Sequence, residues 1–292
     1  MGQDEPIILC ELLPETRARI EAYAEALKAG AAKIGGHGLT ESEFWDSGIF
    51  RSAIERLRGQ QAASLVEKQR FMAEVLGHMK SGGHIKEWAF KGAGERFDYE
   101  IILCSGRTCI IESKGCLDGN NTNIFERPPQ ADEFLIWSLC QNPGADPRHN
   151  AWSGIHVRLG AEVIHRQQRV DGLVIWDMVC GTPGRPCPKL HIDPSRGVRI
   201  NAGRTVPPPC IYLFPRSIPD PRNNPHPATW RLNEVEFLHA LWRCFKGDSS
   251  DVVEISIESR MSDADVQRRT ILRRDGRQCA ASDWTTLKRA RR

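Results

Sequence analysis

The sequence lacks the long apolar runs of membrane segments and the leader of a secreted protein. No window approaches 18 uninterrupted apolar residues, and the N-terminus has no basic stretch followed by an apolar one. Pro6 stands where a myristoylation signal requires Ser or Thr. We therefore expect a cytoplasmic protein that does not bind membranes.

The ten cysteines lack the spacing of a zinc finger. There is no Cys-x-x-Cys pair, and the nearest cysteines are Cys104 with Cys109, Cys109 with Cys116, and Cys180 with Cys187. In a reducing compartment cysteines are thiols or metal ligands rather than disulfides. We expect buried or idle thiols and no structural metal, with a zinc site as the open alternative.

A net charge of either sign is nearly absent from the chain as a whole. The 40 Lys and Arg residues against 37 Asp and Glu residues leave only +3, so bulk charge does not indicate a nucleic-acid partner. The positive charge is instead local, because residues 260–292 contain 10 basic and 4 acidic residues. We expect this segment to form a solvated basic arm, which either contacts phosphates or merely keeps the protein soluble.

Apolar periodicity predicts a mixture of helices and strands. Helices are expected at 14–33, 40–79, 154–168 and 234–245. Strands are expected at 87–90, 99–104, 108–112, 173–178, 198–200, 211–214 and 252–257. The segment 115–147 is predicted to be a loop with a short helix at 134–139. The fold class is α/β or α+β, with a central mixed β-sheet flanked by helices, and residues 1–259 form a single domain with a helical N-terminal part.

One predicted hairpin carries the most informative residues. Asp98 opens its first strand, and Glu112-Ser113-Lys114 closes the second as the only acid-x-Lys in the chain. Composition alone predicts about 1.3 such tripeptides, so the motif depends on its context. Alternation along a strand puts Glu112 and Lys114 on one face. A turn at 105–107 would place Asp98 opposite Lys114 and diagonal to Glu112.

Such a cluster suits phosphodiester hydrolysis. Two neighbouring carboxylates repel each other unless a hard cation lies between them, and Mg²⁺ prefers oxygen ligands. A lysine beside them can stabilise charge in the transition state or orient a water molecule. The alternative is a surface hairpin with an ordinary ladder of Glu and Lys side chains.

At these residues the chain resembles the PD-(D/E)XK nuclease superfamily, the fold of most type II restriction endonucleases. Asp98 matches the first acid and Glu112, Ser113 and Lys114 the acid-x-Lys, whereas Phe97 stands where the motif prefers Pro. More loosely, the strand expected at 173–178 fits the family's order of helix, three meander strands, helix and strand. The resemblance implies a restriction-endonuclease-like core, catalytic Asp98, Glu112 and Lys114, Mg²⁺ held by the two acids, double-stranded DNA as substrate and a homodimer.

A site-specific enzyme also needs groups that read base edges. The segment after the motif offers Asn120, Asn121, Asn123, Arg127 and Gln130. These residue types form hydrogen bonds with bases, so we predict that they bind DNA, although turn chemistry alone would explain a polar loop here.

Several alternatives remain open at this point. Glu67 or Glu74 could supply a third carboxylate, and Asp171 is a rival first acid. The arginines of one predicted helix and its end could follow phosphates or face solvent: Arg158, Arg166 and Arg169. We predict a Mg²⁺-dependent, site-specific endonuclease of the type II restriction kind. The alternatives are a repair or recombination nuclease of the same fold and a DNA-binding protein that does not cleave.

Overall fold

Most of the predicted elements form in the computed structural model, which describes residues 10, 13–29, 40–42, 49–50, 53–54, 65–92, 97–117, 126–140 and 145–286. The α-helices are α1 (Pro14–Ala29), α4 (Leu65–Ser81), α5 (Pro147–Trp152), α6 (Gly160–His165), α7 (Pro188–Ile192) and α8 (Glu236–Cys244). A π-helix, η2 (Ser153–Leu159), joins α5 to α6, and three short 3₁₀ turns are η3 (Pro194–Arg196), η4 (Leu232–Glu234) and η5 (Ser249–Asp251).

The strands begin after α4 and continue to the end of the described chain. They are β1 (Glu87–Phe90), β2 (Tyr99–Ile102), β3 (Thr108–Lys114), β4 (Glu133–Ser138), β5 (Gly172–Ile175), β6 (Val198–Asn201), β7 (Arg204–Val206), β8 (Cys210–Leu213), β9 (Val252–Ser262), β10 (Asp265–Arg274), β11 (Arg277–Ala281) and β12 (Thr285–Thr286).

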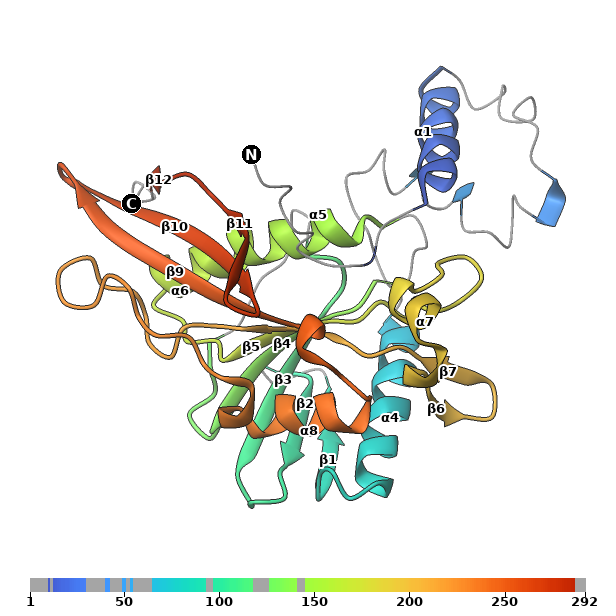
Figure 1. Cartoon of the computed structure of the whole chain (residues 1–292), viewed down its shortest axis with the longest axis horizontal. Coiled ribbons are helices and arrows are strands. Elements are labelled where there is room, and N and C mark those ends of the chain that lie inside the picture. Colours follow the sequence, from blue (N-terminus) through green and yellow to red (C-terminus); the bar gives the residue numbers. More distant parts are fainter. Residues whose placement is uncertain are drawn as a thin grey trace.

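Ten of these strands form one mixed sheet with helices on both faces (Figure 1). Its order is β1-β2-β3-β4-β5-β8-β9-β10-β11, with β12 paired to β10. Strands β1 to β3 form an antiparallel meander, and β4 and β5 then run parallel to β3. The predicted class, a mixed sheet flanked by helices, is confirmed.

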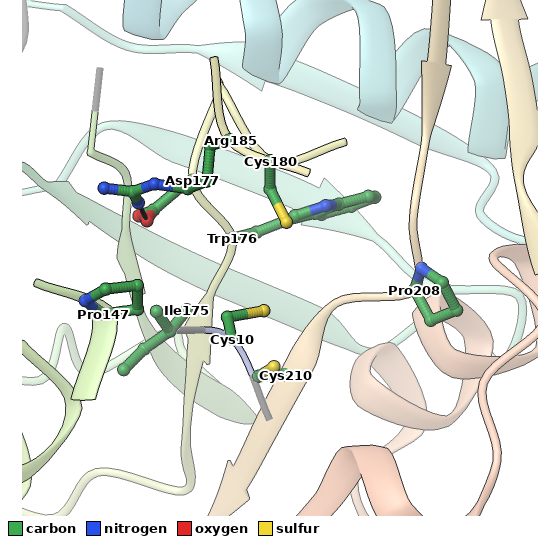
Figure 2. A pocket seen from close by; sticks show the side chains of 9 residues that line it. All are labelled: Cys10, Pro147, Ile175, Trp176, Asp177, Cys180, Arg185, Pro208 and Cys210. Carbon is green, nitrogen blue, oxygen red and sulfur yellow. Dashed lines mark hydrogen bonds and ion pairs between the residues drawn. The ribbon is translucent and has the colours of Figure 1, made fainter. Parts of the chain in front are cut away.

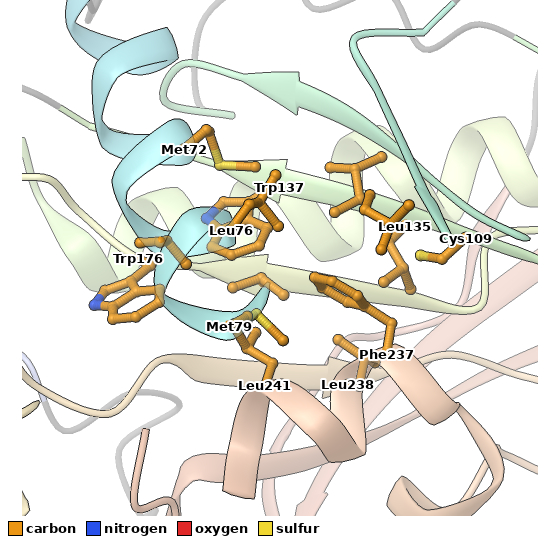
Figure 3. Packing of buried hydrophobic residues seen from close by; sticks show 14 of the residues in the cluster. Met72, Leu76, Met79, Cys109, Leu135, Trp137, Trp176, Phe237, Leu238 and Leu241 are labelled. Atoms are coloured by element: carbon orange, nitrogen blue, oxygen red, sulfur yellow. The ribbon is translucent and has the colours of Figure 1, made fainter. Parts of the chain in front are cut away.

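Helices α4 and α8 cover one face of the sheet (Figure 3). Along α4 the buried side chains recur at helical spacing, as Phe71, Met72, Val75 and Met79 show. Between the helices and the sheet, the rings of Trp137 and Trp176 stack with centroids 5.9 Å apart. This packing fixes α4 beside the meander that carries the acidic residues.

The other face is covered by the continuous run of α5, η2 and α6. Its buried residues Ile155 and Leu159 belong to the same core as Ile110 and Ile136 of the sheet. His156 Nδ1 lies 3.1 Å from Thr270 Oγ1 of β10, so this helical run also contacts the C-terminal strands. The helix predicted at 154–168 is therefore confirmed, with a π-helical first part.

Two predictions about chain segments are wrong. The segment 134–139, expected as a loop with a short helix, lies in β4, because it is fully buried between two parallel strands and pairs with β3 and β5. Periodicity alone does not distinguish a short buried strand from a helix.

The solvated arm expected at 260–292 is also wrong where the structure describes it. Strand β9 runs through the predicted boundary, and β10 pairs with it from Asp265 to Arg273. Ile271 and Leu272 of β10 are buried, so these strands belong to the core despite their many basic residues. Residues 287–292 lie outside the described part of the chain.

The expectation that every cysteine is a thiol or a metal ligand is wrong for one pair. Cys116 and Cys140, which follow β3 and β4, are joined by a disulfide. Because β3 and β4 are parallel neighbours, the two residues leave the sheet at the same end. Among the described helices, none has the length and apolar character needed to cross a bilayer.

Candidate active site at the end of the β2–β3 hairpin

Asp98 and Glu112 lie at the same open end of the hairpin. The register pairs Tyr99 with Ile111, and Asp98 and Glu112 are the next residues towards that end. The N–H of Asp98 donates to the carbonyl of Ile111, at 3.2 Å, and its carboxylate accepts from the hydroxyl of Ser113. The Ser113 side chain lies on the opposite face of β3 from Glu112, so the two acids share one end of the hairpin and do not form a regular pair on one face.

The predicted register was wrong by two residues. The connection consists of residues 104–106 rather than 105–107, because the N–H of Leu103 donates to the carbonyl of Arg107 at 2.9 Å. Gly106 has φ of +92°, a conformation that glycine adopts without strain. The turn thus shifts the strand pairing by two residues, so that Tyr99 and not Ile101 lies opposite Ile111, and Asp98 does not lie opposite Lys114 as predicted.

Lys114 forms an ion pair with Glu112 on the same face of β3. Its Nζ contacts Glu112 Oε1, while Glu112 is only 1% exposed and the Lys114 side chain 18%. A buried carboxylate is costly unless a cation or hydrogen bonds compensate it. Lys114 therefore balances the charge of Glu112 and remains partly accessible from outside.

Ser113, the middle residue of the motif, holds Asp98 in place. Both its backbone N–H and its hydroxyl donate to Asp98 Oδ2, each at 2.7 Å. Two donors on one oxygen fix the orientation of the carboxylate. Side-chain alternation places Ser113 on the opposite face of β3 from Glu112, so Ser113 was not predicted to have a role of its own.

Lys68 is a second lysine near this site and was not among the predicted site residues. It lies three residues before Phe71 and four before Met72, so it shares the face of α4 that packs on the sheet. Burial is the main effect and lowers the pKa of Lys68. The negative charge of Asp98 raises this pKa, and the positive charge of Lys114 lowers it further. These effects place Lys68 within electrostatic range of the motif, a position that its spacing from Phe71 and Met72 could have indicated.

The two candidates for a third carboxylate are engaged elsewhere. Glu67 forms an ion pair with Arg70 at 2.6 Å, and Glu74 forms one with Arg204 of β7 at 3.4 Å. The structure therefore gives each of these acids a cationic partner on α4 or β7.

Arg127 and Gln130 lie near the start of β3, at the opposite end of that strand from Lys114. Because β3 and β4 are parallel, their connection must return along the strand, a distance of roughly 20 Å. The end of the connection is fixed near Thr108, whose N–H donates to Asp132 Oδ2 at 2.8 Å. The structure thus does not bring these two predicted DNA contacts to the motif, while Asn120, Asn121 and Asn123 lie outside the described residues.

Arg127 is held by structural contacts at this far end. Its Nη1 pairs with Asp171 at 2.6 Å, and its guanidinium also donates to the carbonyl of Ala131. Asp171 is 2% exposed, accepts from the N–H of Phe134 at 2.8 Å and pairs with Arg169 at 3.4 Å. Asp171, the rival first acid, therefore balances two arginines and does not face Glu112.

The donor set at the hairpin end fits a hard divalent cation. Asp98 and Glu112 supply carboxylate oxygens at the same end of the hairpin, and oxygen ligands are what Mg²⁺ accepts. The two nearby lysines are cations on flexible stems, which can move aside for a metal or a phosphate more easily than a fixed guanidinium can. The residues present are therefore compatible with Mg²⁺, with Asp98 and Glu112 as its ligands.

No protein-family model matches the chain, and no curated protein or solved structure resembles it significantly.

Proposed function

We propose that the chain is a Mg²⁺-dependent, site-specific endonuclease that hydrolyses phosphodiester bonds in double-stranded DNA, similar to type II restriction enzymes of the PD-(D/E)XK kind. The observation that supports this most directly is the position of Asp98 and Glu112 at one end of the β2–β3 hairpin, with Lys114 paired to Glu112. Glu112 is a buried acid at a strand end, and Asp98 is a second, partly exposed acid at the same end. A purely structural hairpin does not require this unfavourable arrangement.

Each side chain has a distinct role in this proposal. Asp98 and Glu112 bind the metal, and Ser113 keeps the Asp98 carboxylate aligned through its two hydrogen bonds. Lys114 leaves Glu112 to contact the scissile phosphate or to orient the attacking water, and Lys68 adds positive charge from α4. When bound, Mg²⁺ supplies charge neutralisation and makes its bound water more acidic.

Only some of the predicted DNA-binding residues are suited to contact bases. Arg127 is already bonded to Asp171 and two backbone carbonyls, so reading a base would require it to break those bonds. Asn120, Asn121 and Asn123 remain the candidates for base contacts, because they follow directly on the strand that carries Glu112 and Lys114. A homodimer would place one such site on each strand of the duplex.

Plasmid cleavage tests the proposal and separates its alternatives. Purified protein is incubated with mixed-sequence plasmid DNA, with Mg²⁺ and without it. Discrete fragments that require Mg²⁺ support a site-specific nuclease, whereas a smear or nicks confined to unusual DNA structures favour a repair nuclease. Binding without any cleavage would overturn the proposal in favour of a non-cleaving DNA-binding protein.

A matched pair of variants connects the activity to the site. Glu112→Gln keeps the size of the side chain but removes a metal ligand, and we expect at least about a hundredfold slower cleavage. Glu74→Gln makes the same change on α4, in an acid that pairs with Arg204, and should cleave within about threefold of the wild type. Equal activity of the two variants would exclude Glu112 from the site.

A further inference from the structure

Four cysteines from distant parts of the sequence converge beside the sheet. The Sγ atoms of Cys10, Cys180 and Cys187 all lie within 4.8 Å of one another. Cys210, the first residue of β8, contacts Cys10 as a side-chain hydrogen-bond partner. Figure 2 shows Cys10, Cys180 and Cys210 around one small cavity of about 20 Å³. All four are free of disulfides.

The conformation of the loop between β5 and α7 brings the sulfurs of Cys180 and Cys187 together. Asp177 and Arg185, both buried, form an ion pair across the base of the loop. The N–H of Gly181 donates to the carbonyl of Arg185 at 2.9 Å, and the N–H of Arg185 donates to Thr182 at 3.0 Å. Gly181 has φ of +82°, so the chain reverses sharply here and returns Cys187 towards Cys180.

A buried cation stands next to the cluster. Lys189 is 2% exposed, and its Nζ donates to Cys210 Sγ at 3.1 Å and to the carbonyl of Pro208 at 2.9 Å. It also pairs with Asp251 at 2.8 Å. Four thiolates around a divalent cation carry a net charge of −2, and a lysine that donates to one sulfur reduces the cost of burying that charge.

We propose that Cys10, Cys180, Cys187 and Cys210 form a structural zinc site that binds the N-terminal segment and the β5–α7 loop to the start of β8. Four thiolates are a closed, tetrahedral set of soft ligands, which suits zinc and leaves no position for a substrate. Buried cysteines acting as small apolar side chains would explain one or two of these positions. They would not explain why four sulfurs from three separate segments meet beside a buried lysine.

The proposed site differs from the prediction of no structural metal, which rested on spacing along the chain. Zinc-finger spacing describes ligands that lie close in sequence, whereas here Cys10 and Cys210 are joined only by the fold. The site is also independent of the proposed nuclease chemistry, because sulfur ligands select a different metal from carboxylates.

Metal analysis of the full-length protein tests the site directly. Protein purified from zinc-containing medium under reducing conditions is measured by elemental analysis and by native mass spectrometry. We expect about one zinc per chain that survives mild chelation. Replacement of the zinc by cobalt should produce the strong near-ultraviolet bands of cobalt bound to thiolates. Stoichiometric iron in place of zinc, or metal-free protein after refolding with excess zinc, would overturn the proposal.

Variants distinguish a metal site from four packed thiols. Cys187→Ser should lower the zinc content to less than about a tenth of the wild-type value, whereas Cys244→Ser, a half-buried cysteine of α8 outside the cluster, should retain all of it. If Cys187→Ser does not fold, alkylation of the wild-type cysteines distinguishes metal-bound from free thiols. The four cluster thiols should react only after chelation, while the exposed Cys104 reacts at once. Equal reaction rates before and after chelation would overturn the site.

Discussion

The two ends of the sheet around β3 and β4 hold their acids differently. Near the start of β4, Asp171 is held by Arg127 at 2.6 Å and by Arg169 at 3.4 Å, and it accepts from a backbone N–H. At the end of β3, Glu112 pairs with Lys114, and a second acid, Asp98, is bonded to Ser113.

The difference indicates which end is available for chemistry. One acid between two rigid guanidinium groups has its charge fully balanced by fixed partners, an arrangement that stabilises a fold. Two acids at one end of a hairpin concentrate negative charge that a divalent cation can neutralise. Residue types alone do not distinguish the two ends, because each end contains an acidic residue next to a basic one.

The largest expected effect is the loss of cleavage at the carboxyl end of β3. Asp98→Ala, Glu112→Ala and Lys114→Ala should each slow cleavage at least about a hundredfold, because each removes a metal ligand or a transition-state charge. Plasmid cleavage by each variant measures the effect, and circular dichroism shows whether the fold is intact. Near-normal activity in any one of them would remove that residue from the site.

The amino end of β3 should respond in stability instead. Arg127→Ala leaves the buried Asp171 with Arg169 as its remaining arginine partner, so we expect the free energy of unfolding to fall by about 2 kcal/mol. Urea denaturation measures this, with the exposed Gln130→Ala as a control expected within about 0.5 kcal/mol of the wild type. A variant of wild-type stability that has lost only sequence-specific DNA binding would restore Arg127 as a base-reading residue.

His156, in the helical run on the other face of the sheet, tests how burial changes the pKa of a basic side chain. Burial, together with the charge of Arg268, lowers the pKa of His156 to about 4, from about 6.5 in an unfolded chain. Between these values the unfolded chain binds a proton that the folded protein does not. Stability is therefore complete above about pH 6.5 and decreases as the pH falls towards 4.

His156→Gln removes this titrating group and should reduce the loss of stability between pH 6.5 and 4 by roughly 1–2 kcal/mol. Denaturation at a series of pH values measures the difference. An unchanged pH dependence in the variant would contradict the burial of His156 as the cause.

The smallest expected effect concerns Lys68, the lysine that α4 adds to the carboxyl end. Lys68→Gln should slow cleavage about three- to tenfold, less than Lys114→Ala, because Lys68 contributes charge at longer range. Lys80→Gln makes the same change on an exposed lysine of the same helix, which pairs with Glu87, and should have no measurable effect. Equal effects of the two variants would remove Lys68 from the site.

Local patterns predicted α1, the later part of the helix expected at 40–79, α6, α8 and the meander, whereas α5 and α7 were not predicted and tertiary pairing decided the rest. The helical spacing of apolar residues identified α4, and the glycines at 82 and 83 marked its end. Alternation of side chains along the strand placed Glu112 and Lys114 on one face. The register depended on which three residues form the turn, and the apolar runs do not determine that.

Non-local contacts explain the larger errors. The run at 134–139 is a strand only because two parallel neighbours pair with it. The basic segment after residue 260 joins the sheet because its apolar residues lie between arginines that bond to neighbouring elements, as Arg268 does to the carbonyl of His156. Similarly, the position of Arg127 follows from the parallel return of the chain from β3 to β4.

The contact between Cys10 and Cys210 also orders events during synthesis. Two hundred residues separate them in sequence, and ribosomes add about 5 to 20 residues per second, so Cys10 is made roughly 10 to 40 s before its partner. Over this interval α4 and the β2–β3 hairpin can form, because their contacts are local. The cluster can be completed only after Cys210 emerges, so a nascent chain arrested earlier would lack one of its four sulfurs.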